Sequence, residues 1–407
     1  MKKTFNILMI VALTTACQYN KNNDEPNAPL PDAQPIVLQL ADKTVTDNAF
    51  ALDLFKTAYA GSNKPNVFVS PLSVSMALNM TLNGAAGTTA EEMLVALRAT
   101  DYTIDQINEY SRSLRLALLS VDPSTEIAIA NSIWCREGFP VKPPFLNVNR
   151  NDYFAEVSTL DFSRPEALTR INGWCATNTK DKIKEIIDGI PGNAMMYLIN
   201  AIYFKGIWAS KFNKNNTRTD DFHLDNGTAK RVEMMHQTQD FNYTEDETAR
   251  YLELPYGNRA FSMILMLPKD EKTIDDLVSN LSSEQWTQMS KYLSNRTVNL
   301  SLPRFKIECT YSLGQSILPE MGMRVPFSSN ADFSGISDIA LHISFIIHKT
   351  FVEVNEEGTE AAAVTATGMF TTSLSREVDY VVNKPFLFAI REKSTGVILF
   401  IGKAGNV

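Results

Sequence analysis

The order of helical and strand patterns along the chain constrains its fold more than any other feature of the sequence. The strongest helix signal is Ser70-Pro71, a hydroxyl N-cap followed by a proline suited to the first helical position, which predicts a helix to about Leu82. Strand signals, which are short runs of β-branched, aromatic and aliphatic residues, dominate the second half, at residues 198–204, 261–267, 298–302, 345–354, 386–390 and 397–401. Because helices come first and strands cluster late, the sequence predicts an α+β fold rather than a doubly wound sheet.

Other helical patterns fall in the same first half of the chain. They predict helices from Asp47-Asn48 through Ala58, from Thr88 to about Leu97, and over residues 166–179 and 181–188. A chain of 407 residues suggests two or three domains at ~150 residues each. No linker-like segment interrupts residues 40–350, however, so we expect one large domain.

The composition excludes several classes of protein. Hydrophobic residues make up 44% and charged residues 21% of the chain, as in ordinary soluble domains, which excludes disorder, collagen and coiled coil as the main architecture. The net charge of −8 argues against nucleic acid as a partner, because affinity for phosphates comes mainly from Lys and Arg.

The first 40 residues have the pattern of an export signal and a tether. Two lysines precede an apolar run that is too short to span a bilayer, and small residues lead to Cys17. This segment resembles the lipobox of bacterial lipoproteins, which implies that residues 1–16 are removed and that Cys17 carries the lipid. Residues 17–40, rich in Asn, Asp and Pro, would then be a flexible tether for a domain over 41–407, exported and lipid-anchored to the bacterial outer membrane or the cell surface. An ordinary signal peptide with an incidental cysteine is the alternative.

Motifs of enzymes and metal sites are missing from the sequence. It contains no G-x-S-x-G nucleophile elbow, no H-E-x-x-H and no phosphate-binding glycine loop, and its four histidines are scattered. Cys135, Cys175 and Cys309 are too widely spaced for a zinc site, and we expect buried free thiols. We therefore expect no enzymatic activity, no metal and no cofactor.

The segment that follows the predicted strand at 345–354 has an unusual composition. After Glu360 it holds only small or β-tolerant residues as far as Gly368, with no large apolar anchor. As a strand, this segment would direct one set of side chains to the same face, namely Thr359, Ala361, Ala363, Thr365 and Thr367. Small side chains would let such a strand enter between two neighbours without displacing packed volume. A plain Ala/Thr-rich linker is the alternative.

These motifs together resemble the serpin family over residues 45–407. They follow the family's order, at residues 66–74, 200–208, 302–306, 332–336, 348–363, 383–388 and 400–403. The resemblance implies the serpin fold, with about nine helices packed around three β-sheets, a large central mixed sheet and an exposed reactive-centre loop at about 356–378.

The resemblance also implies a function and a mechanism. Serpins of the inhibitory class are irreversible suicide-substrate inhibitors of serine endopeptidases, and some act on cysteine endopeptidases. The cleaved loop inserts into the central sheet as a new strand and traps the acyl-enzyme. The partners would be target serine proteases, and the protein would be a monomer.

Insertion starts at the loop hinge, and the hinge pattern is intact in this chain. The resemblance assigns it to Glu356, Glu357, Gly358, Thr359, Glu360, Ala361, Ala362 and Ala363. A proline or a charge on the inward face would block insertion, because the ladder needs an N–H and the core admits no unpaired charge. The intact pattern favours inhibition over the alternative, a non-inhibitory serpin acting as a binding or chaperone-like module.

The family's loop length predicts the bait bond. Counting seventeen positions from Glu356 gives cleavage between Thr372 and Ser373, which suits elastase-like proteases with small S1 pockets. Other bonds in the loop would attract other proteases, chymotrypsin-like enzymes at Phe370 or Leu374 and trypsin-like enzymes at Arg376.

Two supporting groups of residues follow from the resemblance. The shutter, a polar cluster beneath the opening sheet, matches Ser70, Ser73, Asn200 and His348. The breach, where the loop first enters, matches Trp208, Arg304 and Glu356, with an arginine where the family often has lysine.

Overall fold

The computed structural model describes residues 31–344, 346–359 and 377–407. Within these ranges the α-helices are α1 (Lys43–Ala60), α2 (Pro71–Leu82), α3 (Gly87–Ala96), α4 (Ile104–Ser120), α5 (Pro143–Asp152), α6 (Pro165–Asn178), α7 (Ile274–Asn280), α8 (Ser283–Tyr292) and α9 (Ile317–Glu320). Short 3-10 helices occur at Lys214–Asn216 and Val325–Phe327.

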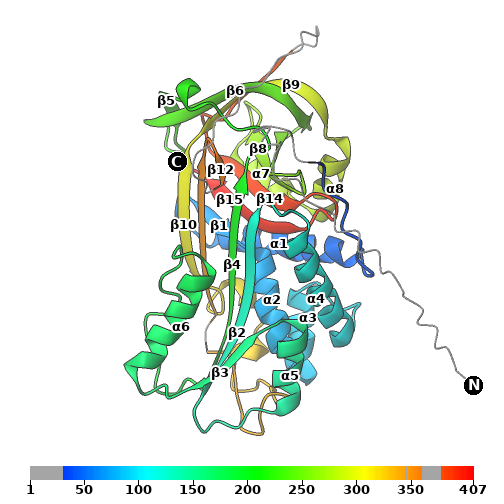
Figure 1. Cartoon of the computed structure of the whole chain (residues 1–407), viewed down its shortest axis with the longest axis vertical. Coiled ribbons are helices and arrows are strands. Elements are labelled where there is room, and N and C mark those ends of the chain that lie inside the picture. The colour runs from blue at the N-terminus through cyan, green and yellow to red at the C-terminus, as the bar shows by residue number, and fades with distance from the viewer. Residues whose placement is uncertain (1–30, 345, 360–376) are drawn as a thin grey trace, which may run out of the picture.

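The strands of the described residues form two sheets (Figure 1). Those of the first half are β1 (Val67–Val69), β2 (Glu126–Arg136), β3 (Glu156–Leu160), β4 (Met196–Ile207), β5 (Arg218–His223), β6 (Ala229–Glu245), β7 (Ala249–Pro255) and β8 (Phe261–Pro268). Those of the second half are β9 (Ser294–Pro303), β10 (Phe305–Ser312), β11 (Ile347–Asn355), β12 (Gly358–Thr359), β13 (Val378–Val381), β14 (Phe386–Glu392) and β15 (Ile398–Ala404).

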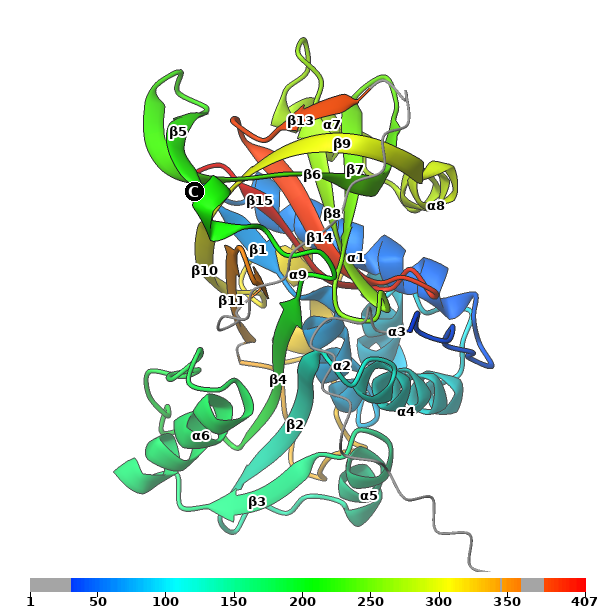
Figure 2. The ribbon, with the colours of Figure 1, turned by 45° about the horizontal axis from the view of Figure 1, so that its top comes forward.

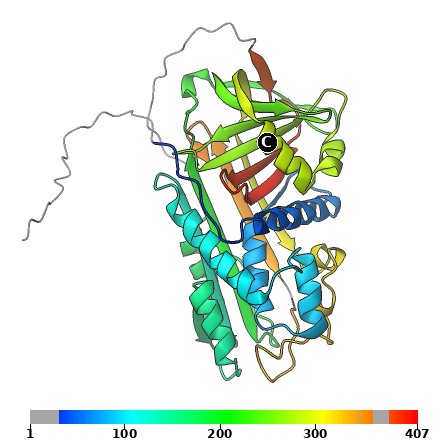
Figure 3. The ribbon, with the colours of Figure 1, turned by 90° about the vertical axis from the view of Figure 1, so that its right-hand side faces the viewer.

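The six-stranded sheet has the order β10-β11-β12-β4-β2-β3. It is mixed, because β2 and β3 are parallel while its other pairs are antiparallel. Helix α6 packs on one face of this sheet, against Trp134 of β2 and Ile199 of β4, and α2 covers the other face (Figures 1 and 3). This sheet corresponds to the large central mixed sheet that the family resemblance implies.

The nine-stranded sheet consists of two parts joined by a short ladder. The part with β5, β6, β9 and β13 meets the part with β1, β15, β14, β8 and β7 only where β6 pairs with β7 over four residues, Asn242–Glu245 (Figure 2). With the six-stranded sheet, these two parts account for the three sheets that we expected. Strands β8, β14 and β15 are buried at every position, as their continuous apolar runs predict.

Helix α2 forms where its local signals predict. The Ser70 side chain accepts a hydrogen bond of 3.3 Å from the Ser73 amide, and Pro71 occupies the first helical position. The helix ends at Leu82, as predicted.

One predicted helix start and one whole predicted helix are wrong, and tertiary contacts explain both differences. Helix α1 begins at Lys43 instead of near Asp47, because the Lys43 ammonium is buried 2.6 Å from the Asp47 carboxylate. Helix α3 spans Gly87–Ala96, within one residue of the prediction at each end, and the Thr89 hydroxyl accepts from the Asp332 amide at 2.8 Å. Residues 181–188 are not helical, because the Asn172 side chain binds the main chain of Ile186 and Ile187.

The described part of the predicted tether contacts the domain. The Ala33 amide donates to the Asn258 carbonyl at 2.9 Å, and Asp32 pairs with Arg259 at 2.7 Å, so ordered contacts begin before the expected boundary at residue 41. Cys17 and residues 1–16 lie outside the described residues. Among the helices that the structure describes, none combines the length and apolar character needed to cross a membrane.

The other three cysteines are free and buried, as the sequence predicts. Burial raises the pKa of Cys135 to about 11 and that of Cys175 to about 12, and it also raises the pKa of Cys309. Thiolates are the reactive form, so these thiols are expected to be inert near neutral pH.

Candidate functional site

Two residues of the predicted hinge already form a strand of the central sheet. In β12, Gly358 and Thr359 pair with Ile207 and Gly206 of β4 on one side. On the other side they pair with the end of β11 (Figure 1). The hinge therefore enters the sheet between β11 and β4 in the intact chain.

Two glycines make this entry sterically possible. A Cβ atom on Gly358 would lie 2.0 Å from the carbonyl oxygen of Gly206, and Gly358 has a φ of +148°. A Cβ atom on Gly206 would lie 2.6 Å from the ring of Tyr256. The main chains of β12 and β4 can approach this closely because Gly358 lacks a side chain, and the Tyr256 ring can pack against β4 because Gly206 lacks one.

Thr359 is anchored in a buried aromatic contact beneath this crossing. Its side chain is 2% exposed, and its hydroxyl lies 2.6 Å from the Tyr256 hydroxyl. The Tyr256 ring stacks on Trp208 with centroids 4.4 Å apart. The Trp208 indole also donates to the Asn355 carbonyl at 2.9 Å, so this predicted breach residue holds the end of β11, directly before the hinge.

The other two predicted breach residues, Arg304 and Glu356, form an ion pair. The Arg304 Nε donates to both carboxylate oxygens of Glu356, at 2.9 and 3.0 Å. The Thr217 hydroxyl donates to the same carboxylate. Burial alone would raise the pKa of Glu356, but these hydrogen bonds outweigh burial and lower it.

Glu357 is held by two lysines. Its carboxylate lies 2.9 Å from the Lys211 ammonium and 3.1 Å from that of Lys214, and the Glu357 side chain is 8% exposed. Both acidic residues that precede β12 in the hinge, Glu356 and Glu357, are therefore paired, and the chain before β12 is fixed from two sides.

Replacing Glu356 with glutamine should lower the melting temperature at pH 7. Because the folded-state pKa is depressed, the stabilisation by the carboxylate is present above its ordinary pKa of 4.5 and is lost as the pH falls through the folded-state value. Melting curves of the chain and of Glu356→Gln across this range should therefore converge at low pH. A constant offset at every pH would contradict the ionic role.

Three of the predicted shutter residues meet at the start of α2. The Ser70 amide donates to His348 Nε2 at 2.9 Å, the Ser70 hydroxyl donates to the Leu399 carbonyl at 2.8 Å, and Ser73 binds Ser70. The fourth, Asn200, lies on β4 and donates to Asn131 of β2 at 2.7 Å. The hydrogen bonds described for Asn200 and Ser70 do not join the two residues, but Asn200, Ser73 and His348 line one cavity.

Burial of His348 should make the fold sensitive to acid. Burial lowers the pKa of His348 from 6.5 to about 4, so the folded state keeps the ring neutral. Unfolded chains bind a proton below about pH 6.5, so stability should fall by about 3 kcal/mol between pH 6.5 and pH 4. Replacing His348 with glutamine should remove this part of the pH dependence of the melting temperature, and an unchanged pH profile would contradict the assignment.

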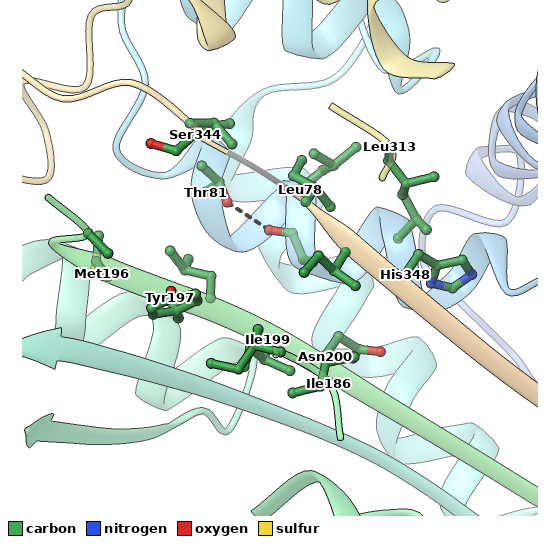
Figure 4. Close-up of a pocket in the computed structure, with 18 of the residues that line it drawn as sticks. Leu78, Thr81, Ile186, Met196, Tyr197, Ile199, Asn200, Leu313, Ser344 and His348 are labelled. Atoms are coloured by element: carbon green, nitrogen blue, oxygen red, sulfur yellow. Dashed lines mark hydrogen bonds between the residues drawn. The ribbon is translucent and has the colours of Figure 1, made fainter. Parts of the chain in front are cut away.

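A cavity of about 380 Å³ separates β4 from β11 below β12 (Figure 4). Helix α2 supplies one wall and the segment after α6 supplies another, through Leu78 and Ile186. The two strands that hold β12 at their upper ends are thus not paired with each other along this cavity.

Several predicted site residues lie outside the described residues. They are Glu360, Ala361, Ala362, Ala363, Phe370, Thr372, Ser373, Leu374 and Arg376. Within the described part of the chain, no group of three or more His, Cys, Asp or Glu side chains could hold a metal ion.

Sequence reasoning missed Gly206 and Tyr256 as parts of the hinge site. A glycine in the interior of a strand often marks the close approach of another main chain, so Gly206 carried a usable signal. Tyr256 carried none, because its role depends on contacts with Trp208 and Thr359, which lie far from it in the sequence.

Comparisons with known proteins agree with this geometry. The family model "Serpin (serine protease inhibitor)" matches residues 45–407. The leukocyte elastase inhibitor of Xenopus laevis is 38% identical over 367 residues, covering 87% of this chain and 96% of that protein. Human serpin B3 is 35% identical over 379 residues, with the same two coverages.

Comparison with solved structures also gives similar proteins that cover most of the chain. The crystal structure of the thermophilic serpin tengpin in the native state matches with a TM-score of 0.83 and 32% identity, covering 92% of this chain and 97% of that one. Thyroxine-binding globulin in complex with thyroxine matches with a TM-score of 0.81 and 31% identity, covering 90% of this chain and 99% of that one. The predicted α+β serpin fold is confirmed, and the chain belongs to the serpin family.

Proposed function

We propose that the chain is an irreversible suicide-substrate inhibitor of serine endopeptidases, rather than an enzyme. The observation that carries the proposal is β12: two hinge residues already occupy a strand position whose continuation is an unfilled space between β4 and β11. A protease that cleaves the loop would release the restraint on its far end. The freed segment could then continue β12 as a full strand while the protease is still attached as an acyl-enzyme.

The register of β12 supports insertion of the predicted residues. Thr359 lies opposite Gly206 on β4 and Val354 on β11. Each further residue of an entering strand moves one position back along both neighbours, so Thr365 would lie opposite Asn200 and His348. Thr359 faces the core in the intact chain, so the predicted inward set of small residues would face the core as well.

The same register supports the predicted bait bond at Thr372–Ser373. Thirteen positions beyond Thr359, residue 372 would lie opposite Asn193 and Leu341, which both line the cavity. Insertion of the fifteen or so residues up to Thr372 corresponds to ~50 Å of travel at ~3.3 Å per residue. Cleavage after Arg376 would leave a tether to the protease four residues longer than cleavage after Thr372, so trapping should be weaker. Elastase-like enzymes are therefore the favoured targets, with chymotrypsin-like and trypsin-like enzymes as alternatives.

A protease panel tests the proposal directly. Mixing the chain with elastase-like and trypsin-like proteases should give a complex that survives SDS and boiling. Sequencing of the released peptide should give an N-terminus at Ser373. Only cleaved chain and fully active protease, across a broad panel, would refute inhibition.

The second candidate is a non-inhibitory serpin that acts as a binding module. It is favoured by the likeness to thyroxine-binding globulin, which was solved in complex with thyroxine. A zinc metalloprotease forms no acyl-enzyme, so it gives cleaved chain without trapping. A rise in melting temperature after such cleavage would favour insertion, and an unchanged melting temperature would favour the binding module.

We also propose export and lipid anchoring, on the sequence pattern alone. Residues 1–16 would be the signal peptide and Cys17 the lipidated residue, at the bacterial outer membrane or cell surface. Mass spectrometry of the mature N-terminus tests this: an unmodified Cys17 would rule out the anchor.

A further inference from the structure

A chain of two side-chain amides fixes which atom of Asn200, a residue that lines the cavity, is left unpaired. The Tyr153 carbonyl can only accept, and it accepts from the Asn131 side-chain Nδ2 at 2.7 Å. The Asn131 Oδ1 therefore faces Asn200 and accepts from its Nδ2 at 2.7 Å. Asn200 is left with its Oδ1, which is buried and has no hydrogen-bond partner among the described residues.

His348 presents the opposite polarity from the other side of the cavity. Its Nε2 accepts from the Ser70 amide at 2.9 Å, so Nε2 carries no proton. Because burial keeps the imidazole neutral near pH 7, the single ring proton is on Nδ1. Figure 4 shows His348 on β11 and Asn200 on β4, so the residue with the free acceptor and the residue with the ring donor line the cavity from different strands.

The rest of the lining is mainly aliphatic. It includes Leu78, Ile186, Ile199, Ile202, Leu313 and Ile343. A volume of about 380 Å³ lies within the range of small-molecule sites, which combine apolar walls with a few fixed polar groups. An apolar body is therefore favoured at this place, together with a group that both donates and accepts.

We propose that this cavity binds a small apolar molecule that carries one hydroxyl. The hydroxyl donates to Asn200 Oδ1 and accepts from His348 Nδ1–H, while the apolar body packs on the aliphatic walls. Asn131 is a positioning residue, because it prevents the Asn200 amide from turning its NH2 group toward the cavity. A consequence that rests on the proposed function follows: a bound ligand fills the space that the cleaved loop must enter, so it turns the inhibitor into a substrate.

The probe is 4-ethylphenol, compared with 4-ethylanisole, whose ether oxygen cannot donate. Calorimetric titration of the full chain should show saturable binding of the phenol and about tenfold weaker binding of the ether, because a buried acceptor would be left unpaired. Equal affinities for the two probes would overturn the proposal.

Variants test the amide chain. Asn131→Leu should remove the preference for the phenol while keeping apolar binding, because the Asn200 amide is then free to rotate. Asn79→Leu is the matched control: Asn79 is also buried, and its side-chain amide donates to Ser111 rather than to Asn131 or Asn200. If both variants keep the preference, Asn131 has no positioning role and the proposal fails.

Cleavage separates this proposal from the proposed function. If metalloprotease cleavage raises the melting temperature, the cleaved chain should no longer bind 4-ethylphenol, and retained binding would overturn the assigned cavity. If cleavage leaves the melting temperature unchanged, inhibition by insertion fails. The phenol site is then decided by the ether comparison and the Asn131→Leu variant, which need no loop insertion.

Discussion

Thr359→Arg should abolish formation of the SDS-stable complex while leaving loop cleavage intact. The Thr359 side chain is 2% exposed and its hydroxyl meets the buried Tyr256 hydroxyl, so an arginine there would bury an unpaired charge. Such a charge costs several kcal/mol, and 1.4 kcal/mol already slows a step tenfold. Gel analysis with an elastase-like protease should show cleaved chain in place of complex.

Because β12 is paired in the intact chain, the arginine should act before cleavage as well. The melting temperature of uncleaved Thr359→Arg should fall, since the pairing of β12 with β4 and β11 is lost. Thr359→Ser keeps the hydroxyl and is the matched control, for which we expect trapping close to that of the parent chain. Unchanged trapping by Thr359→Arg would contradict the assignment of the hinge.

Arg391→Met should produce the largest loss of stability. Arg391 and Glu253 form an ion pair at 2.7 Å, with side chains 3% and 2% exposed. Removing one partner of a buried pair costs about 3–5 kcal/mol. The half-exposed Lys393 ammonium, 3.7 Å from the Glu253 carboxylate, would compensate the remaining charge only in part. The denaturation midpoint in urea, followed by tryptophan fluorescence, should fall accordingly.

Two controls separate the buried charge from the loss of contact. Arg164→Met breaks a surface ion pair in which the side chains of Arg164 and Asp161 are 73% and 38% exposed. This variant should lower the free energy of unfolding by less than about 1 kcal/mol. Glu253→Leu combined with Arg391→Met removes both charges and should recover much of the loss. A double variant as unstable as Arg391→Met alone would contradict an uncompensated charge as the cause.

The sequence predicted the fold where local chemistry decides the structure. The Ser70 cap and Pro71 fix the start of α2 without distant partners, and the short β-branched and aromatic runs at β8, β14 and β15 favour buried strands, which is what they form. The helix predictions were wrong where contacts between residues far apart in the sequence determine the local structure. Residues 181–188 have a helical pattern, but Ile183, Ile186 and Ile187 instead line the cavity beside β4.

The resemblance to serpins grouped Trp208, Arg304 and Glu356, and the structure places all three beside or within the start of the hinge. The sequence did not predict that Gly358 and Thr359 are already in the sheet of the intact chain. That depends on the approach of Gly206, more than 150 positions earlier, which no local pattern encodes.

The buried strands after the loop should hold the two pieces of a cleaved molecule together. A cut at the proposed bond releases residues 373–407 from the covalent chain, but this piece contains β14 and β15, which are buried at every position, and Tyr380, which is fully buried. The two pieces should therefore travel together through any native separation and part only in denaturant. A cleaved molecule can therefore be recognised afterwards, because its two pieces separate only in denaturant. A denaturing gel of a cell extract would then give the fraction of molecules that have been cleaved.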